Sequence, residues 1–235
     1  MREATNLDWA DTPFGAARRP FAERTPLLAA FSVVHTDRFS PAAAGAVYLR
    51  LPRGRLLMVA DTTLRFGFHA VAAQDAADVP AIVALVDGLL VQARRQAAVL
   101  AGHRFAGELS LLTAAIGRPV RGITSVAAAW GEENPERGLA RLLDTADRTG
   151  PATLADLCAR HRLHGLDRSP GGHAAEAASS LAVLDPLRQS VGHALAIALI
   201  AARNTGHYQW DDLHLDALVD AAAWDQTTSV RTETA

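Results

Sequence analysis

Residues 99–112 contain the side chains best suited to chemistry. The segment begins with a short apolar run, passes through Gly102 and His103, and continues in a helical pattern that carries Glu108. Polar side chains at the carboxyl end of a buried strand meet the start of the next helix at one edge of an α/β sheet, so this spacing predicts a site with an imidazole and a carboxylate. The pattern also fits a plain strand-to-helix turn in which His103 caps the junction and Glu108 is solvated.

Composition limits the classes of protein. The chain has 235 residues, of which 49% are hydrophobic and 20% charged, enough for one large domain. A formal net charge of −2 provides no strong overall attraction for nucleic acid, so such binding needs a local patch. All 23 basic residues are Arg, which together with the abundant Ala is typical of a GC-rich, bacterial genome. The single cysteine, Cys158, excludes an internal disulfide and lies at helical spacing from Leu154 and Leu157, which predicts a buried thiol.

The first half of the chain predicts strands followed by a strand and helix alternation. Three apolar runs predict strands, the last two joined as an antiparallel hairpin through the turn Pro52-Arg53-Gly54. An apolar stripe of period 3.6 then predicts a helix over 78–96, followed by a second strand–helix unit. The expected elements are an arm over 1–26, strands over 29–35, 45–51, 55–60 and 98–101, and a helix after Gly107.

The second half is read mostly as helices. Residues 123–130 fit a strand or a packed loop, and 139–146 fit a strand that ends at Asp144-Thr145. Thr153 is an expected N-cap of the next helix. Further helices are expected over 172–184 and 191–204, with an amphipathic element over 210–224 and disorder after Gln226. We therefore expect an N-terminal arm over 1–26, an α/β domain over 27–206, and a C-terminal element with a disordered tail over 207–235.

The N-terminus lacks the unbroken apolar region of a signal peptide, because Asp8, Asp11 and Arg18 interrupt it. No window was expected to reach the roughly 18 apolar residues of a membrane span. The sequence therefore predicts a cytoplasmic protein without a membrane partner.

Three segments have motif-like spacing along this order of elements. They are Val34-His35-Thr36-Asp37 at the end of the first strand, His103-Arg104-Phe105-Ala106-Gly107-Glu108, and Gly192-His193-Ala194-Leu195-Ala196-Ile197 in the late helix. In this order, over about residues 29–204, the chain resembles the DEDDh 3′–5′ exonucleases of the ribonuclease H-like fold. The matching family motifs are Asp-x-Glu, His-Asn-x-x-Phe-Asp and His-x-x-x-x-Asp.

The resemblance implies an α/β fold with a mixed sheet, in which antiparallel hairpin strands precede parallel strands and helices flank the sheet. It requires 29–36 and 97–102 to be neighbouring strands. The chemistry of that family needs four carboxylates to hold two Mg²⁺ ions. The corresponding positions hold His35, Asp37, Glu108 and Ile197, so only two acids remain and both differ in length from those of the family.

Candidate site residues follow from this resemblance. The expected catalytic residues are Asp37, Glu108 and His193. The expected metal ligands, for Mg²⁺ or Mn²⁺ if any metal binds, are His35, Asp37 and Glu108. The expected nucleic-acid contacts are Thr36, Arg38, His103 and Arg104. One imidazole with two carboxylates suits a single Mn²⁺ or Zn²⁺ better than a pair of Mg²⁺ ions, and the implied partner is single-stranded DNA or RNA.

Three functional hypotheses remain open from the sequence. The first is an exonuclease-like domain without effective catalysis, a pseudoenzyme that binds single-stranded nucleic acid. The second is an active metal-dependent 3′–5′ exonuclease with a rearranged acid set of Asp37, Glu108 and Glu176. The third is a soluble α/β interaction or scaffolding protein, and the sequence is compatible with a homo-oligomer or a protein partner.

Overall fold

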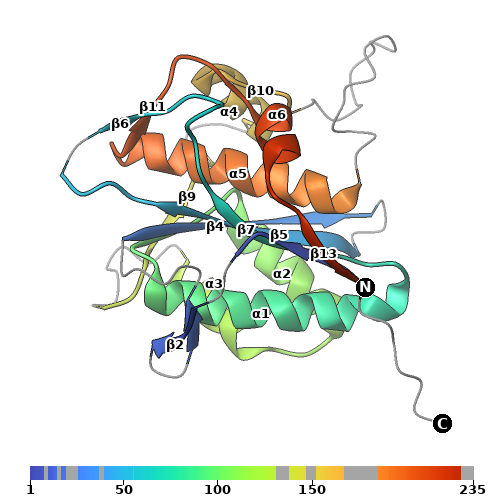
Figure 1. Cartoon of the computed structure of the whole chain (residues 1–235). Coiled ribbons are helices and arrows are strands. Elements are labelled where there is room, and N and C mark those ends of the chain that lie inside the picture. The colour runs from blue at the N-terminus through green and yellow to red at the C-terminus, as the bar shows by residue number, and fades with distance from the viewer. Residues whose placement is uncertain are drawn as a thin grey trace.

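A seven-stranded mixed sheet lies between two layers of helices (Figure 1). This computed structural model describes residues 1–7, 10–14, 17–19, 26–36, 40–54, 56–130, 138–146, 152–166 and 185–228. In spatial order the strands are β13 (Asp225–Thr228), β1 (Arg2–Thr5), β7 (Gly67–Ala72), β5 (Pro41–Arg50), β4 (Leu27–His35), β8 (Val99–Gly102) and β9 (Arg141–Asp144). The expected α/β class with a mixed sheet is confirmed.

The direction of the strands changes in the middle of the sheet. Strands β13, β1, β7, β5 and β4 pair antiparallel, each with the next. Strand β8 is parallel to β4, with Leu28 opposite Val99 and Ala30 opposite Ala101, and β9 is parallel to β8. The expected adjacency of 29–36 and 97–102 is therefore confirmed.

Helices cover both faces of this sheet (Figure 1). One face packs against α1 (Val79–Gln96), α2 (Phe105–Ile116) and α3 (Arg121–Ala129), and the other against α4 (Leu154–His161), α5 (Pro186–Asn204) and α6 (Leu215–Ala221). Side chains of β4 alternate between the two faces of the sheet. Leu28 belongs to the core that contains α5, and Phe31 belongs to the core that contains α1. A 3-10 turn, η1 (Ala76–Asp78), precedes α1.

Short strand pairs lie outside the main sheet. They are β2 (Ala10–Phe14) with β3 (Ala17–Arg19), β6 (Leu57–Met58) with β11 (Tyr208–Gln209), and β10 (Leu163–His164) with β12 (Leu213–His214). The last two pairs are parallel and join segments far apart in the sequence.

Two long helices form most of the core. Helix α5 is buried nearly all round, as its composition predicted, and approaches β5 so closely that a Cβ at Gly45 would lie 2.8 Å from the Ser190 carbonyl oxygen. Helix α1 packs a stripe including Ile82 and Leu90 against the sheet. Contrary to expectation, Ala76–Gln96 is long and apolar enough to span a membrane by length and composition alone. Its buried stripe is that of a core helix.

The expected hairpin between 45–51 and 55–60 is wrong. Strand β7 is the antiparallel partner of β5. Among the described residues 56–60, only Leu57 and Met58 form a strand, and both side chains are exposed. Every residue of β7 is buried, so β7 gains more from joining the central sheet than the exposed run does.

Two further expectations differ from the structure. Residues 123–130 lie mostly in helix α3, where Ile123 and Val126, three positions apart, face the core. Residues Arg2–Thr5, expected in an arm, form β1 between β7 and β13. Residues 172–184, expected to be helical, lie outside the described residues.

Candidate active site at the carboxyl edge of the sheet

Three parallel strands end at one edge of the sheet. His35 is the last residue of β4, Gly102 ends β8 and Asp144 ends β9. Because parallel strands present their carboxyl ends together, polar residues that follow them meet there. We use the name carboxyl-edge cluster for His35, His103, Glu108, Thr145 and His193.

His35 and Glu108 are in contact within this cluster. The His35 Nδ1 atom lies 3.5 Å from Glu108 Oε2, and the two side chains are 13% and 28% exposed. Burial raises the pKa of Glu108 to about 7 and lowers the pKa of His35. Among the described residues, neither His35 Nε2 nor Glu108 Oε2 has a hydrogen-bond partner. The pair therefore has polar atoms free to bind a ligand, and burial favours the uncharged form of each group.

His103 follows β8 and is held by Thr145. Its Nδ1 lies 3.2 Å from Thr145 Oγ1, which itself donates to the Gly102 carbonyl at 3.1 Å. Since the hydroxyl proton is used in that bond, we assign the imidazole proton to Nδ1, which leaves Nε2 as an acceptor. Burial lowers the pKa of His103, Asp144 opposes this effect, and Arg104 adds to it. His103 is thus oriented as a neutral acceptor.

His193 approaches the same cluster from α5. Burial is the main cause that lowers its pKa to about 4, and the charge of His103 contributes. Ile197 lies one helical turn further on and is 3% exposed. The helix therefore presents a neutral imidazole followed by an apolar side chain, where the resemblance implies a carboxylate.

Asp144 is a structural residue whose role the sequence analysis missed. Its carboxylate accepts from the backbone N–H groups of Arg104 at 2.8 Å and Phe105 at 3.1 Å, and from the Trp130 indole at 3.0 Å. It therefore caps α2 from a neighbouring strand, because Arg104 at the N-cap makes no side-chain cap. An acid directly after a predicted strand was the available signal, but its target lies forty positions earlier in the chain.

Arg104 adopts the left-handed conformation, with φ of 50°. Its guanidinium donates from Nη2 to the Ala152 carbonyl at 3.3 Å. Thr36 is exposed, its backbone N–H donates to the Ser40 carbonyl, and its hydroxyl accepts from the Ser40 N–H. Thr36 thus closes the turn between β4 and β5.

Three predicted residues lie outside the described part of the chain. They are Asp37 and Arg38, which follow β4, and Glu176, the third acid of the rearranged set. Their contribution to the cluster stays a prediction.

The donors of the cluster do not fit a two-Mg²⁺ centre. Mg²⁺ prefers oxygen ligands, whereas His35 provides nitrogen and Ile197 provides no donor. Across the residues that the structure describes, no group of three or more His, Cys, Asp or Glu side chains could hold a metal ion. We therefore derive no metal-dependent step from this cluster.

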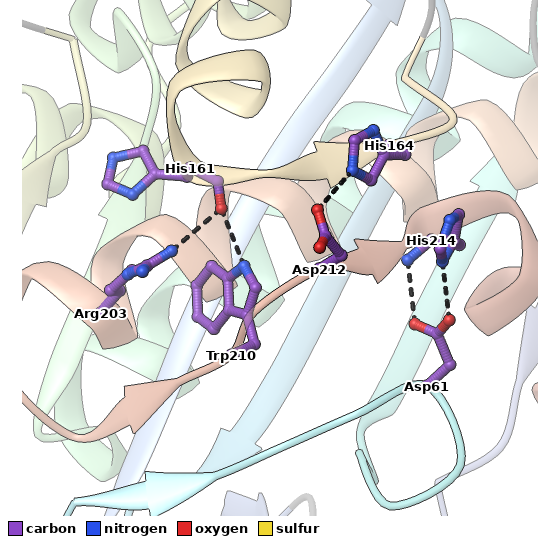
Figure 2. A network of polar contacts seen from close by, with 7 residues as sticks. All are labelled: Asp61, His161, His164, Arg203, Trp210, Asp212 and His214. Atoms are coloured by element: carbon purple, nitrogen blue, oxygen red, sulfur yellow. Dashed lines mark hydrogen bonds and ion pairs between the residues drawn. The ribbon is translucent and has the colours of Figure 1, made fainter.

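A second polar network lies beyond α5 and joins the segment that follows this helix to α4 and α5. Figure 2 shows the His161 carbonyl accepting from the Trp210 indole at 2.8 Å and from Arg203 at 3.0 Å. The Arg203 guanidinium also lies over the Trp210 ring, 4.7 Å from its centroid. These contacts anchor Trp210, which is buried, to α4 and α5.

Two imidazoles in this network stack on each other. His164 contacts Asp212 at 2.9 Å and His214 contacts Asp61 at 2.8 Å, and the ring centroids are 5.2 Å apart (Figure 2). Each imidazole has a carboxylate partner and is about half exposed. The first pair joins β10 to the residue that precedes β12, and the second joins β12 to the loop between β6 and β7. Both pairs therefore have a structural role.

Comparison of the chain with protein-family models, with curated proteins and with solved structures gave no match in any of the three. The choice of site therefore rests on geometry. The carboxyl-edge cluster is the candidate because it combines buried polar atoms that have no hydrogen-bond partner among the described residues with imidazoles whose pKa values burial lowers.

Proposed function

We propose that the chain is a catalytically degenerate 3′–5′ exonuclease-like domain that binds single-stranded nucleic acid at the carboxyl edge of its sheet. The spatial order β7-β5-β4-β8-β9, with antiparallel strands followed by parallel ones, agrees with the ribonuclease H-like fold that the resemblance implies. Agreement of fold alone supports no activity, so the proposal depends on the site.

The contact between His35 and Glu108 carries this proposal. These residues occupy the first and third acid positions of the resemblance, and their side chains lie 3.5 Å apart although they are distant in the sequence. This contact supports a site of the kind that the resemblance implies, with a changed chemistry, because one acid position holds His35 and another holds the buried Ile197. Loss of such ligands removes the stabilisation that two metal ions give to the leaving oxygen.

The remaining groups suit binding of a nucleotide strand. Burial raises the pKa of Glu108 to about 7, so its protonated form is populated near neutral pH and can donate a hydrogen bond. The neutral imidazoles of His103 and His193 provide acceptors and stacking faces for exposed bases. Arg38 and Arg104 are the proposed phosphate contacts. Ionisation of Glu108 above neutral pH weakens this binding, because a carboxylate repels phosphate.

The test uses a labelled single-stranded oligonucleotide with Mg²⁺ or Mn²⁺. We expect no trimming from the 3′ end, together with binding that weakens as salt rises, with a slope of about −0.7 per phosphate contact. Arg104→Gln and His103→Ala are expected to weaken binding, whereas Arg118→Gln, an exposed arginine outside the cluster, is the matched control.

Two results would contradict the proposal. Robust trimming that Asp37→Ala and Glu108→Ala both abolish would support the rearranged enzyme. Absence of binding even at low salt would support a scaffolding protein without a nucleic-acid role.

A further inference from the structure

A cavity of about 280 Å³ lies at the opposite edge of the sheet from the carboxyl-edge cluster. It is formed by the last two turns of α1, the first two turns of α3 and Leu139, which precedes β9. The Ala140 N–H donates to the Arg94 carbonyl at 2.8 Å, and Arg141 begins β9, which places the cavity at the amino ends of the parallel strands. It is therefore separate from the site proposed above.

Three arginines line this cavity: Arg94, Arg95 and Arg121. Arg95 and Arg121 are exposed, whereas Arg94 is only 6% exposed. Within the described ranges, no carboxylate lies within ion-pair distance of any of the three guanidinium groups. Among the residues that the structure describes, these three arginines form a cluster of positive charge with no paired acid, in a chain whose net charge is −2.

The buried guanidinium of Arg94 points to an anion. Its Nη1 donates to the Ala140 carbonyl, which uses one of its five N–H donors. Burial of a charged group is costly unless the group is paired, and a carbonyl oxygen supplies no neutralising charge. The Asp87 carboxylate accepts from the Ile123 N–H through Oδ1 at 2.8 Å, and it makes no ion pair with Arg94. An anion in the cavity would compensate the charge of Arg94.

The lining selects the chemistry of the ligand. Guanidinium groups match phosphate oxygens with paired, charge-assisted hydrogen bonds. Val91, Val126 and Leu139 form an apolar wall beside the arginines. The volume is close to the lower end of the range of about 300–1,000 Å³ for small-molecule sites. The cavity thus suits a compact phosphorylated ligand rather than a polymer.

We propose that this cavity is a second binding site, which takes a small molecule carrying a diphosphate group on Arg94, Arg95 and Arg121. The ligand is either inorganic pyrophosphate or a nucleoside diphosphate, since both present the same phosphate oxygens. The site is independent of the oligonucleotide binding proposed for the carboxyl-edge cluster.

The experiment titrates pyrophosphate, and separately a nucleoside diphosphate, into the full chain at low salt by calorimetry. We expect binding by the wild type, affinity lowered about tenfold in Arg95→Gln and in Arg121→Gln, and a larger loss in the double variant. Arg118→Gln, an exposed arginine outside the cavity, is the matched control and is expected to bind as the wild type does. Because both substituted side chains are exposed, these variants test the site even where Arg94→Gln fails to fold.

Comparison of the two affinities shows whether the site takes pyrophosphate or a nucleoside diphosphate. Tighter binding of the nucleoside diphosphate identifies a nucleotide that also uses the apolar wall, and equal affinities identify the diphosphate alone. Wild-type protein that binds neither ligand, or a double variant that binds as the wild type does, overturns the proposal. Loss of oligonucleotide binding in the double variant also overturns it, because the arginines would then belong to the nucleic-acid surface.

Discussion

Replacement of Glu108 by Gln removes the ionisable group from the carboxyl-edge cluster and nearly keeps its size. Burial raises the pKa of Glu108 from 4.5 to about 7. The unfolded chain releases this proton near pH 4.5, so between about pH 4.5 and 7 the folded protein binds more protons than the unfolded one, and its stability falls as pH rises through that window.

The size of this effect follows from the rise in pKa. At about 1.36 kcal/mol for each pH unit, the rise corresponds to about 3 kcal/mol. Since the Glu108 side chain is 28% exposed, solvent screens part of the penalty, and we expect about 2 kcal/mol. The Glu108→Gln protein lacks this penalty, so its stability advantage over the wild type should be near zero at about pH 4 and reach about 2 kcal/mol at about pH 8.

The assay is urea denaturation of both proteins at pH values across this window, with the difference in unfolding free energy plotted against pH. The buried imidazoles, whose pKa values are lowered, act at low pH on both proteins and largely cancel in the difference. Asp211→Asn, an exposed carboxyl outside the cluster, is the control. A flat difference would refute the reasoning. If the free energy of unfolding of the wild type instead increases relative to that of the variant as pH rises, Glu108 forms a stabilising ion pair with His35.

Three further predictions concern two residues that shape the carboxyl edge of the sheet and the buried thiol of α4. Gly102→Ala should destabilise the protein by about 2 kcal/mol in urea denaturation, because its Cβ would lie 2.5 Å from Phe105 Cβ. The matched Gly107→Ala, with nothing within 4 Å, should instead be neutral or stabilise by up to about 1 kcal/mol, and equal effects of the two would contradict this reasoning. Asp144→Ala should lower the free energy of unfolding by about 1–2 kcal/mol because it removes the cap of α2, and an unchanged Tm would exclude that role. Burial raises the pKa of Cys158 to about 12, so a thiol reagent at neutral pH should label it only after unfolding in urea, and rapid labelling of native protein would show that the thiol is accessible.

Local patterns in the sequence predicted the elements whose side chains alternate or repeat strongly. The stripe of α1, the short apolar β8 and the N-cap Thr153 of α4 all follow from nearby residues. The predictions failed where pairing is non-local. Strand β1 has no apolar pattern of its own and forms because its backbone pairs with β7 on one side and β13 on the other.

The order of residues along the chain specifies which side chains the site can use: an imidazole at His35, a carboxylate at Glu108, and Ile197 where a ligand is implied. The chemistry of these side chains depends on how distant segments pack. Parallel pairing of β4 with β8 brings His35 and Glu108 to 3.5 Å, and burial of that contact raises the pKa of Glu108 and lowers that of His35. The cavity of Arg94, Arg95 and Arg121 also depends on tertiary structure, because segments distant in the sequence form it. No local pattern of residues predicts how far such packing desolvates a side chain.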